Sequence, residues 1–197
     1  MGFISEYIDV FKRVLTEPDA FFEQEDRTNG FAFPIRFAAV SSLIYGVLGA
    51  TRTLIFGAQM GIEQTAIPGL AAFSVVLTPI VSLIGIFISA GLIHLFVSLF
   101  GGEGGYEATA AVMCYATALS VVVSALYLIP LLGALLAFVL AFYGIYIQAR
   151  GLEHFHDISL GKGIASVIIP AVILLVIVLV LMFTLFAGFV ALSAPLG

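Results

Sequence analysis

Charged residues, tryptophan and cysteine are all scarce in this chain of 197 residues. Only 10% of the residues are charged and 62% are hydrophobic, whereas about a quarter of a typical soluble domain is charged. A water-soluble fold of this length has too little polar surface to cover so many apolar side chains. Intrinsic disorder, which requires low hydrophobicity and high charge, is excluded as well. The composition therefore predicts an integral membrane protein whose first partner is the lipid bilayer.

The scarce residue types exclude further classes of function. Cys114 is the single cysteine, which excludes an intramolecular disulfide and an all-cysteine metal site. Lys and Arg number 7 against 12 Asp and Glu, so no nucleic acid partner is expected. The motifs HExxH, GxSxG and GxxxxGK[ST] do not occur. We therefore expect no catalytic residues, no cofactor and no resident metal.

Long hydrophobic runs are what the chain has in abundance. A helix of about 20 apolar residues crosses the hydrocarbon core of a bilayer. Pro130 divides one apolar region of about twice that length, which predicts a helical hairpin there. Unbroken aliphatic sequence over 172–181 is incompatible with the alternating pattern of a β-barrel. The predicted fold is all-α, with five transmembrane helices over residues 31–56, 70–100, 108–128, 131–148 and 163–192.

About half of the charged residues precede the first span, which predicts a polar segment over 1–30 and a membrane domain over 31–197. Within the polar segment, residues 4–15 place apolar side chains at helical spacing, among them Tyr7, Phe11 and Leu15. Such an amphipathic helix lies in the membrane interface, or its apolar face packs on the transmembrane helices. The sequence leaves both arrangements open. Pro18 predicts a second short helix after it.

The basic residues predict an orientation, because short cytoplasmic loops are enriched in Lys and Arg. With a cytoplasmic N-terminus and five spans, only Arg52 lies outside and the C-terminus is external. The loops over 101–107 and 149–162 then face the cytoplasm. We expect the plasma membrane of a prokaryote. The basic residues on the predicted cytoplasmic side are Lys12, Arg13, Arg27, Arg36, Arg150 and Lys162.

Few ionisable residues fall inside the spans. His94, Tyr115 and Arg36 form a candidate intramembrane polar site, since such groups are costly in lipid and often functional. A single hydroxyl or carbonyl neighbour would also satisfy a neutral His94. No Asp or Glu lies near the centre of a span, which argues against a proton-coupled pump. His154 and His156 could approach a metal on an extended loop, but a solvated loop is the favoured interpretation.

Several short motifs, taken in order, resemble the Yip family of Ypt/Rab-interacting membrane proteins in its prokaryotic form. The amphipathic segment leads to a Pro-Asp-Ala-Phe-Phe entry, and a glycine–tyrosine loop follows the second span. A Tyr-Ala pair, an Ile-Pro turn and a Gly-Leu-Glu-His loop come later. The matching segments are 18–22, 101–109, 115–116, 129–130, 151–154 and 158–163.

This resemblance implies five spans and a cytoplasmic N-terminus, and it marks Gly105 and Tyr106 as a cytoplasmic interaction motif, to which we add the adjacent Glu107. The chain lacks the Asp-Leu-Tyr-Gly-Pro motif of eukaryotic members, so the sequence does not support a GTPase partner. Two functions follow as hypotheses. One is a non-enzymatic scaffold or adaptor in membrane organisation or trafficking-like processes, which docks other membrane proteins or a second copy, or shapes the bilayer. The other is a small-solute transporter or channel, with a polar cavity opening to the cytoplasm near His94 and Glu107.

Overall fold

The computed structural model describes residues 2–25 and 30–193, with side chains of the last helix described to residue 186. Within these residues every regular element is a helix, as the sequence predicts. Five helices have the length and apolar composition to cross a membrane, which confirms an integral membrane fold. The helices are α1 (Phe3–Thr16), α2 (Pro18–Gln24), α3 (Ala32–Phe56), α4 (Ile67–Leu99), α5 (Tyr106–Leu126), α6 (Leu132–His156) and α7 (Leu160–Ser193).

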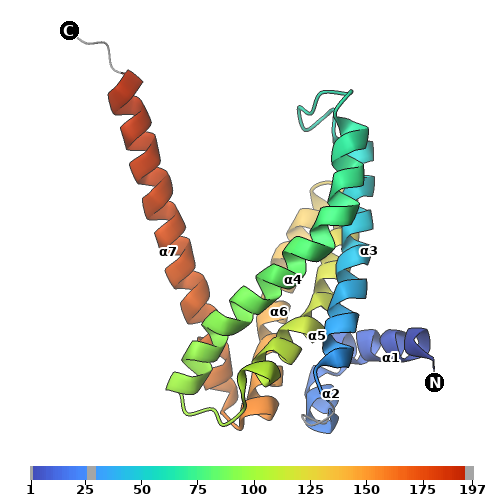
Figure 1. The fold of residues 1–197 in the computed structure, drawn as a ribbon, viewed down its shortest axis with the longest axis vertical. Coiled ribbons are helices and arrows are strands. Elements are labelled where there is room, and N and C mark those ends of the chain that lie inside the picture. The colour runs from blue at the N-terminus through green and yellow to red at the C-terminus, as the bar shows by residue number, and fades with distance from the viewer. Residues whose placement is uncertain (1, 26–29, 194–197) are drawn as a thin grey trace.

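The first four long helices, α3 to α6, form the body of the molecule (Figure 1). Helix α3 packs on α4 and α5, α5 packs on α6, and α7 contacts α6 and α4. Helix α1 runs across one end of the bundle rather than along it, and α2 lies at the same end (Figure 1). The α4–α5 loop and the α6–α7 corner also lie there, while the α3–α4 loop lies at the opposite end. This grouping of loops is the one that five spans require.

Small residues allow α3 and α4 to approach closely. A Cβ atom on Gly46 would lie 3.2 Å from Thr78 Cβ, so a larger residue would push the helices apart. One helical turn away, the Ser42 hydroxyl donates a hydrogen bond of 3.1 Å to Ser82 Oγ. Small side chains and hydroxyl pairs are the usual means of helix association in lipid, where burial of apolar area gives little driving force.

The hairpin predicted at Pro130 is confirmed. Helix α5 ends at Leu126 and α6 begins at Leu132, so the two spans are separate and antiparallel neighbours. A Cβ atom on Gly133 would clash with the carbonyl oxygen of Leu126, so the turn can close only with glycine at this position.

The fourth span is longer than predicted. Helix α6 continues past residue 148 to His156, so the expected loop over 149–162 shrinks to residues 157–159. The prediction relied on continuous hydrophobicity, and the polar residues after position 148 interrupt the apolar run, so it missed roughly the last two turns of the helix. The apolar residues of this stretch still recur at helical spacing and are buried. These residues are Ala149, Leu152 and Phe155.

Candidate functional site

Most of the residues singled out from the sequence gather at the end of the bundle that carries α1, α2 and the α4–α5 loop (Figure 1). Helix α1 is fixed there by one apolar face. Tyr7, Val10 and Val14 are buried, and the Tyr7 hydroxyl lies 3.0 Å from Ser41 Oγ on α3. The Tyr7 ring centroid is 4.8 Å from that of Phe37. Burial raises the pKa of Tyr7, an effect that the Ser41 hydrogen bond partly offsets.

A second apolar face of α1 remains uncovered. Ile4 and Ile8 have exposed fractions of 74% and 46%. Phe11 and Leu15 continue the same face at helical spacing and are half-buried against the edge of the core. The two arrangements that the sequence left open are therefore both present, on different faces of one helix. Tyr7 belongs to the packed face, whereas Phe11 and Leu15 lie between the two.

Helix α2 inserts its phenylalanines into the centre of this end. The rings of Phe21 and Tyr115 meet edge to face with centroids 5.0 Å apart, and Phe22 lies beside both. Tyr115 also donates a hydrogen bond of 2.7 Å to Glu25 Oε1. Buried residues of α1 and α2 thus share one core with those of the spans. The boundary predicted at residue 30 stays a prediction, and Asn29 beside it lies outside the described residues.

The glycine-rich loop between α4 and α5 owes its glycines to close packing. A Cβ atom on Gly104 would lie 2.5 Å from His156 Nδ1 and would also clash with the Phe155 carbonyl oxygen. Gly101 adopts φ +84°, a conformation that glycine tolerates best. Between them, the Glu103 N–H donates a hydrogen bond of 3.1 Å to the His156 carbonyl oxygen. The loop is therefore fastened to the end of α6.

The predicted interaction motif lies at the start of α5. Gly105 is the N-cap residue, and Glu107 is exposed in the first turn, where a negative charge complements the helix dipole. Tyr106 donates a hydrogen bond of 2.9 Å to the Phe87 carbonyl oxygen on α4 and keeps an exposed fraction of 38%. Of the two side chains in the motif, that of Tyr106 is thus partly committed to the fold, whereas that of Glu107 is exposed.

His94 has two hydroxyl partners rather than an open site, Thr109 and, at 3.5 Å from its Nε2, Ser98 Oγ. Its Nδ1 lies 3.0 Å from Thr109 Oγ1, and the same oxygen lies 2.9 Å from His156 Nε2. A hydroxyl has a single proton, so at least one of these two imidazole nitrogens must donate. The sequence identifies His94 but misses Thr109 and His156, because the latter was expected in a solvated loop. The three side chains tie α4, α5 and α6 together.

Arg36 lies apart from His94 and Tyr115. Its Nε donates to the Ala32 carbonyl oxygen at 3.1 Å, and its guanidinium carbon is 5.8 Å from the Phe3 ring centroid on α1. The structure therefore distributes the candidate polar site over three places. Arg36 contacts α1, Tyr115 contacts α2, and His94 contacts α5 and α6.

An ionic cluster that the sequence did not reveal joins α2 to α6. Arg150 Nη1 lies 3.3 Å from Asp19 Oδ1 and 2.7 Å from Glu153 Oε2, and His154 Nε2 lies 2.9 Å from Asp19 Oδ1. The hydrogen bond from His154, with the charge of Arg150, holds the pKa of Asp19 below its usual value. Asp19, Glu153 and His154 could all approach one cation. The Arg150 guanidinium already forms an ion pair with each of the two carboxylates, so a link between helices explains the cluster better.

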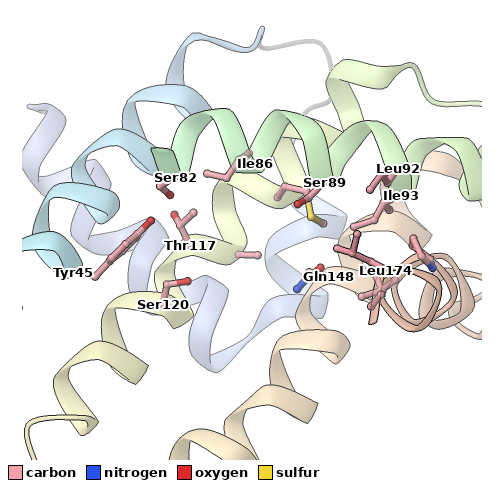
Figure 2. A pocket seen from close by; sticks show the side chains of 16 residues that line it. Tyr45, Ser82, Ile86, Ser89, Leu92, Ile93, Thr117, Ser120, Gln148 and Leu174 are labelled. Carbon is pink, nitrogen blue, oxygen red and sulfur yellow. The ribbon is translucent and has the colours of Figure 1, made fainter. Parts of the chain in front are cut away.

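Two cavities lie near the predicted polar site. Glu107 and Tyr115 line a small one of about 40 Å³, together with Glu25. The larger one, of about 530 Å³, lies deeper, among residues of α3 to α7 (Figure 2). Neither His94 nor Glu107, near which the sequence places a polar cavity, is among the residues that line it. Its polar lining comes from other residues, described below.

Comparison with known proteins places the chain in a family. Residues 12–182 match the family model of the Yip1 domain. No curated protein matches the chain. No solved structure matches it either. The matched region contains α2 to α6 and most of α7, so the family assignment rests on nearly the whole membrane domain. The chain is therefore an integral membrane protein that belongs to the Yip1 family.

Proposed function

We propose that this protein is a non-enzymatic scaffold or adaptor that organises the plasma membrane of a prokaryote. The observation that carries the proposal is helix α1, which is fixed across the end of the bundle and still exposes Ile4 and Ile8. A helix held in this way reaches the boundary between headgroups and acyl chains without crossing it. It adds volume to one leaflet only, and it moves with the bundle as one body.

The three faces of α1 support this position. Tyr7 and Val14 fix the helix to the protein, the Ile4 and Ile8 face is free to enter lipid, and Asp9 and Lys12 are exposed for water and headgroups. A helix that served only to complete the core would have no use for its second apolar face. An apolar face of this kind buried in the interface stabilises membrane association in proportion to its area.

The basic residues support a cytoplasmic N-terminus. Arg52 lies on the last part of α3, at the opposite end of the bundle from α1 and α2. Arg27, which the sequence also places on the inner side, lies outside the described residues. The remaining basic residues fall on elements at or near the α1 end. They are Lys12, Arg13, Arg36, Arg150 and Lys162.

The interaction motif of Gly105, Tyr106 and Glu107 is the best candidate for contact with another membrane protein or a second copy. Tyr106 and Glu107 are exposed at the same end as α1. The net charge of −5 does not favour nucleic acid, and the missing Asp-Leu-Tyr-Gly-Pro motif does not favour a GTPase. Transport is the weaker candidate, since His94 is engaged with Thr109 and the cavity beside Glu107 holds about 40 Å³.

The proposal is tested by changing the exposed face alone. Ile4→Asp with Ile8→Asp places two charges where lipid is expected and leaves the packed face of α1 intact. In phosphatidylcholine proteoliposomes, we expect the unaltered protein to reduce vesicle diameter as its density rises, because α1 expands one leaflet. The double variant should insert equally well and lose this effect. Vesicle diameters are measured by electron cryomicroscopy, and insertion by flotation.

The matched control adds the same two charges to the polar face, as Ser5→Asp with Thr16→Asp. Both residues are exposed and their side chains bond only to backbone of α1 or of the residue before it. This control should behave like the unaltered protein. Equal vesicle diameters for the Ile4/Ile8 variant and the unaltered protein would contradict the proposal.

A further inference from the structure

The larger cavity lies at the depth of the acyl chains and has an unusual lining (Figure 2). Ser89 lies ten residues before the end of α4, and Gln148 lies eight residues before the end of α6. Both are therefore roughly 12–15 Å from the end of the bundle that carries α1 and α2. None of the sixteen lining residues is charged. Six carry a hydrogen-bonding group in the side chain, namely Tyr45, Ser82, Ser89, Thr117, Ser120 and Gln148.

Four of these six groups have no hydrogen-bond partner among the residues that the structure describes. Ser82 is bonded to Ser42, and Thr117 donates to the Cys114 carbonyl oxygen at 2.6 Å. Within the described part of the chain, the side chains of the other four make no hydrogen bond. Polar groups left unsatisfied in hydrocarbon cost several kcal/mol each, so a membrane protein rarely collects them without use. The four are Tyr45, Ser89, Ser120 and Gln148.

The cavity has a side entrance in the plane of the membrane. Residues of both α4 and α7 line the cavity, and these two helices diverge toward the far end of the bundle (Figure 1). Helix α7 is packed up to Pro170, and every described residue from 171 to 186 is exposed. On the walls, Leu92 and Leu174 are themselves exposed. A molecule dissolved in the hydrocarbon can therefore reach the polar groups without passing through water.

We propose that this cavity binds an uncharged, membrane-soluble molecule with a hydroxyl or carbonyl oxygen on a long apolar body. The volume falls within the range of small-molecule sites, roughly 300–1,000 Å³. Three hydroxyls and one primary amide can each donate to or accept from such an oxygen. A charged ligand would find no countercharge at this depth, which makes its burial costly. The site is independent of α1 and of the scaffold role proposed above.

The test uses a long-chain primary alcohol with a diazirine beside the hydroxyl and a terminal alkyne, in phosphatidylcholine vesicles containing the full chain. After illumination, cross-linked peptides are identified by mass spectrometry. We expect labelling on α4, α5 and α6 around Ser89, Ser120 and Gln148, and competition by the unlabelled alcohol. The matched hydrocarbon probe, without the hydroxyl, should label the exposed stretch 171–186 without saturation.

Two variants separate binding from folding. Ser89→Ala, Ser120→Ala and Gln148→Leu together remove three hydrogen-bonding groups and should lower saturable labelling about tenfold. Ala116→Phe retains all the polar groups and fills the cavity, and it should lower labelling equally. The control Thr184→Val removes a hydroxyl that lies on the lipid-exposed part of α7 and bonds to the Leu181 carbonyl oxygen. It should label as the unaltered protein does.

The outcomes are decisive in both directions. Loss of saturable labelling in both cavity variants, with the control unchanged, supports the proposal. Labelling that does not saturate, or that is equal for the alcohol and the hydrocarbon probes, overturns it in favour of a groove filled by ordinary acyl chains. Saturable labelling that appears only when the protein is diluted in lipid also overturns it, because a second copy then occupies the cavity. Size-exclusion chromatography of each variant shows that it is folded.

Discussion

At the residue scale, neighbouring glycines of one loop have different roles. Gly104 and Gly105 stand side by side in the motif that resembles the Yip family pattern. A side chain on Gly104 would run into the backbone of Phe155 and the ring of His156, whereas a Cβ on Gly105 would meet nothing within 4 Å. The first glycine is therefore required by packing. The second lies at an open N-cap position where other residues fit.

This difference gives a matched prediction. Gly104→Ser should lower the free energy of unfolding by about 1–3 kcal/mol, the usual cost of overpacking, because backbone atoms of α6 must move. Gly105→Ser should leave stability unchanged or slightly raised, since serine is a favourable N-cap residue. Thermal unfolding in detergent measures both. Equal loss of stability in the two variants would show that the loop does not close on α6 as described.

The contacts between individual side chains on different helices could not be predicted from the sequence. His94 could be recognised as an ionisable group within a span, but Thr109, which it contacts, and His156, which contacts the same hydroxyl, lie on two other helices. Pairing across such distances depends on how helices rotate and cross, which hydrophobic patterning does not specify. The same holds for Asp19 and Arg150. Their types suggest exposed surface charges, and only the docking of α2 on α6 brings them together.

At the element scale, the link between α2 and α6 predicts a response to acid. The pKa of Asp19 is lowered in the folded protein by its hydrogen bond from His154 and by Arg150. The ionised Asp19 therefore stabilises the fold fully above the ordinary Asp pKa of about 3.9. This stabilisation is lost as the pH falls through the lowered pKa of the folded protein. The Asp19 side chain is about half exposed, so the effect should not exceed about 1 kcal/mol. Limited proteolysis of the α1–α2 segment between pH 7 and 3 should show α2 loosening at the acid end.

Two variants define that response. Asp19→Asn removes the titrating group and should give proteolysis that is already faster at neutral pH and changes less toward acid. Glu23→Gln is the control, because Glu23 is an exposed carboxylate of the same helix with no ion pair among the described residues. It should keep the pH dependence of the unaltered protein. An acid response that is the same in Asp19→Asn would exclude Asp19 as its origin.

The helices themselves were largely predictable, for a physical reason. Spans are dictated by a bilayer thickness that demands long apolar runs, and the hairpin at Pro130 follows from length and a helix-breaking residue. The residues at which helices end near the membrane surface are less tightly constrained than the spans themselves. Helix α6 runs on to His156 because its inward face stays apolar while its outward face becomes charged. Continuous hydrophobicity fails to detect such a change, although helical periodicity would have shown it.

At the scale of the whole molecule, the two ends of the bundle differ in construction. The end with α1 and α2 is closed by the aromatic cluster around Tyr115 and by contacts between the α4–α5 loop and α6. Lys162 of α7 adds a hydrogen bond of 2.9 Å to the Phe100 carbonyl oxygen at the end of α4. Toward the other end, α7 separates from α4 (Figure 1). Interactions with water-exposed partners are therefore expected at the closed end, and interactions with lipid along the open side.

The orientation of this asymmetric molecule can be measured with two single cysteines in a Cys114→Ala background. Gln59 lies exposed in the α3–α4 loop and Glu103 lies exposed in the α4–α5 loop, at opposite ends of the bundle. Because basic residues concentrate at the α1 end, we expect a charged, impermeant maleimide to label Gln59→Cys in intact bacterial cells. Glu103→Cys should be labelled only after permeabilisation, when both sites must react equally. The reverse pattern would place α1 on the outer surface, and the scaffold proposal would then apply to the opposite leaflet.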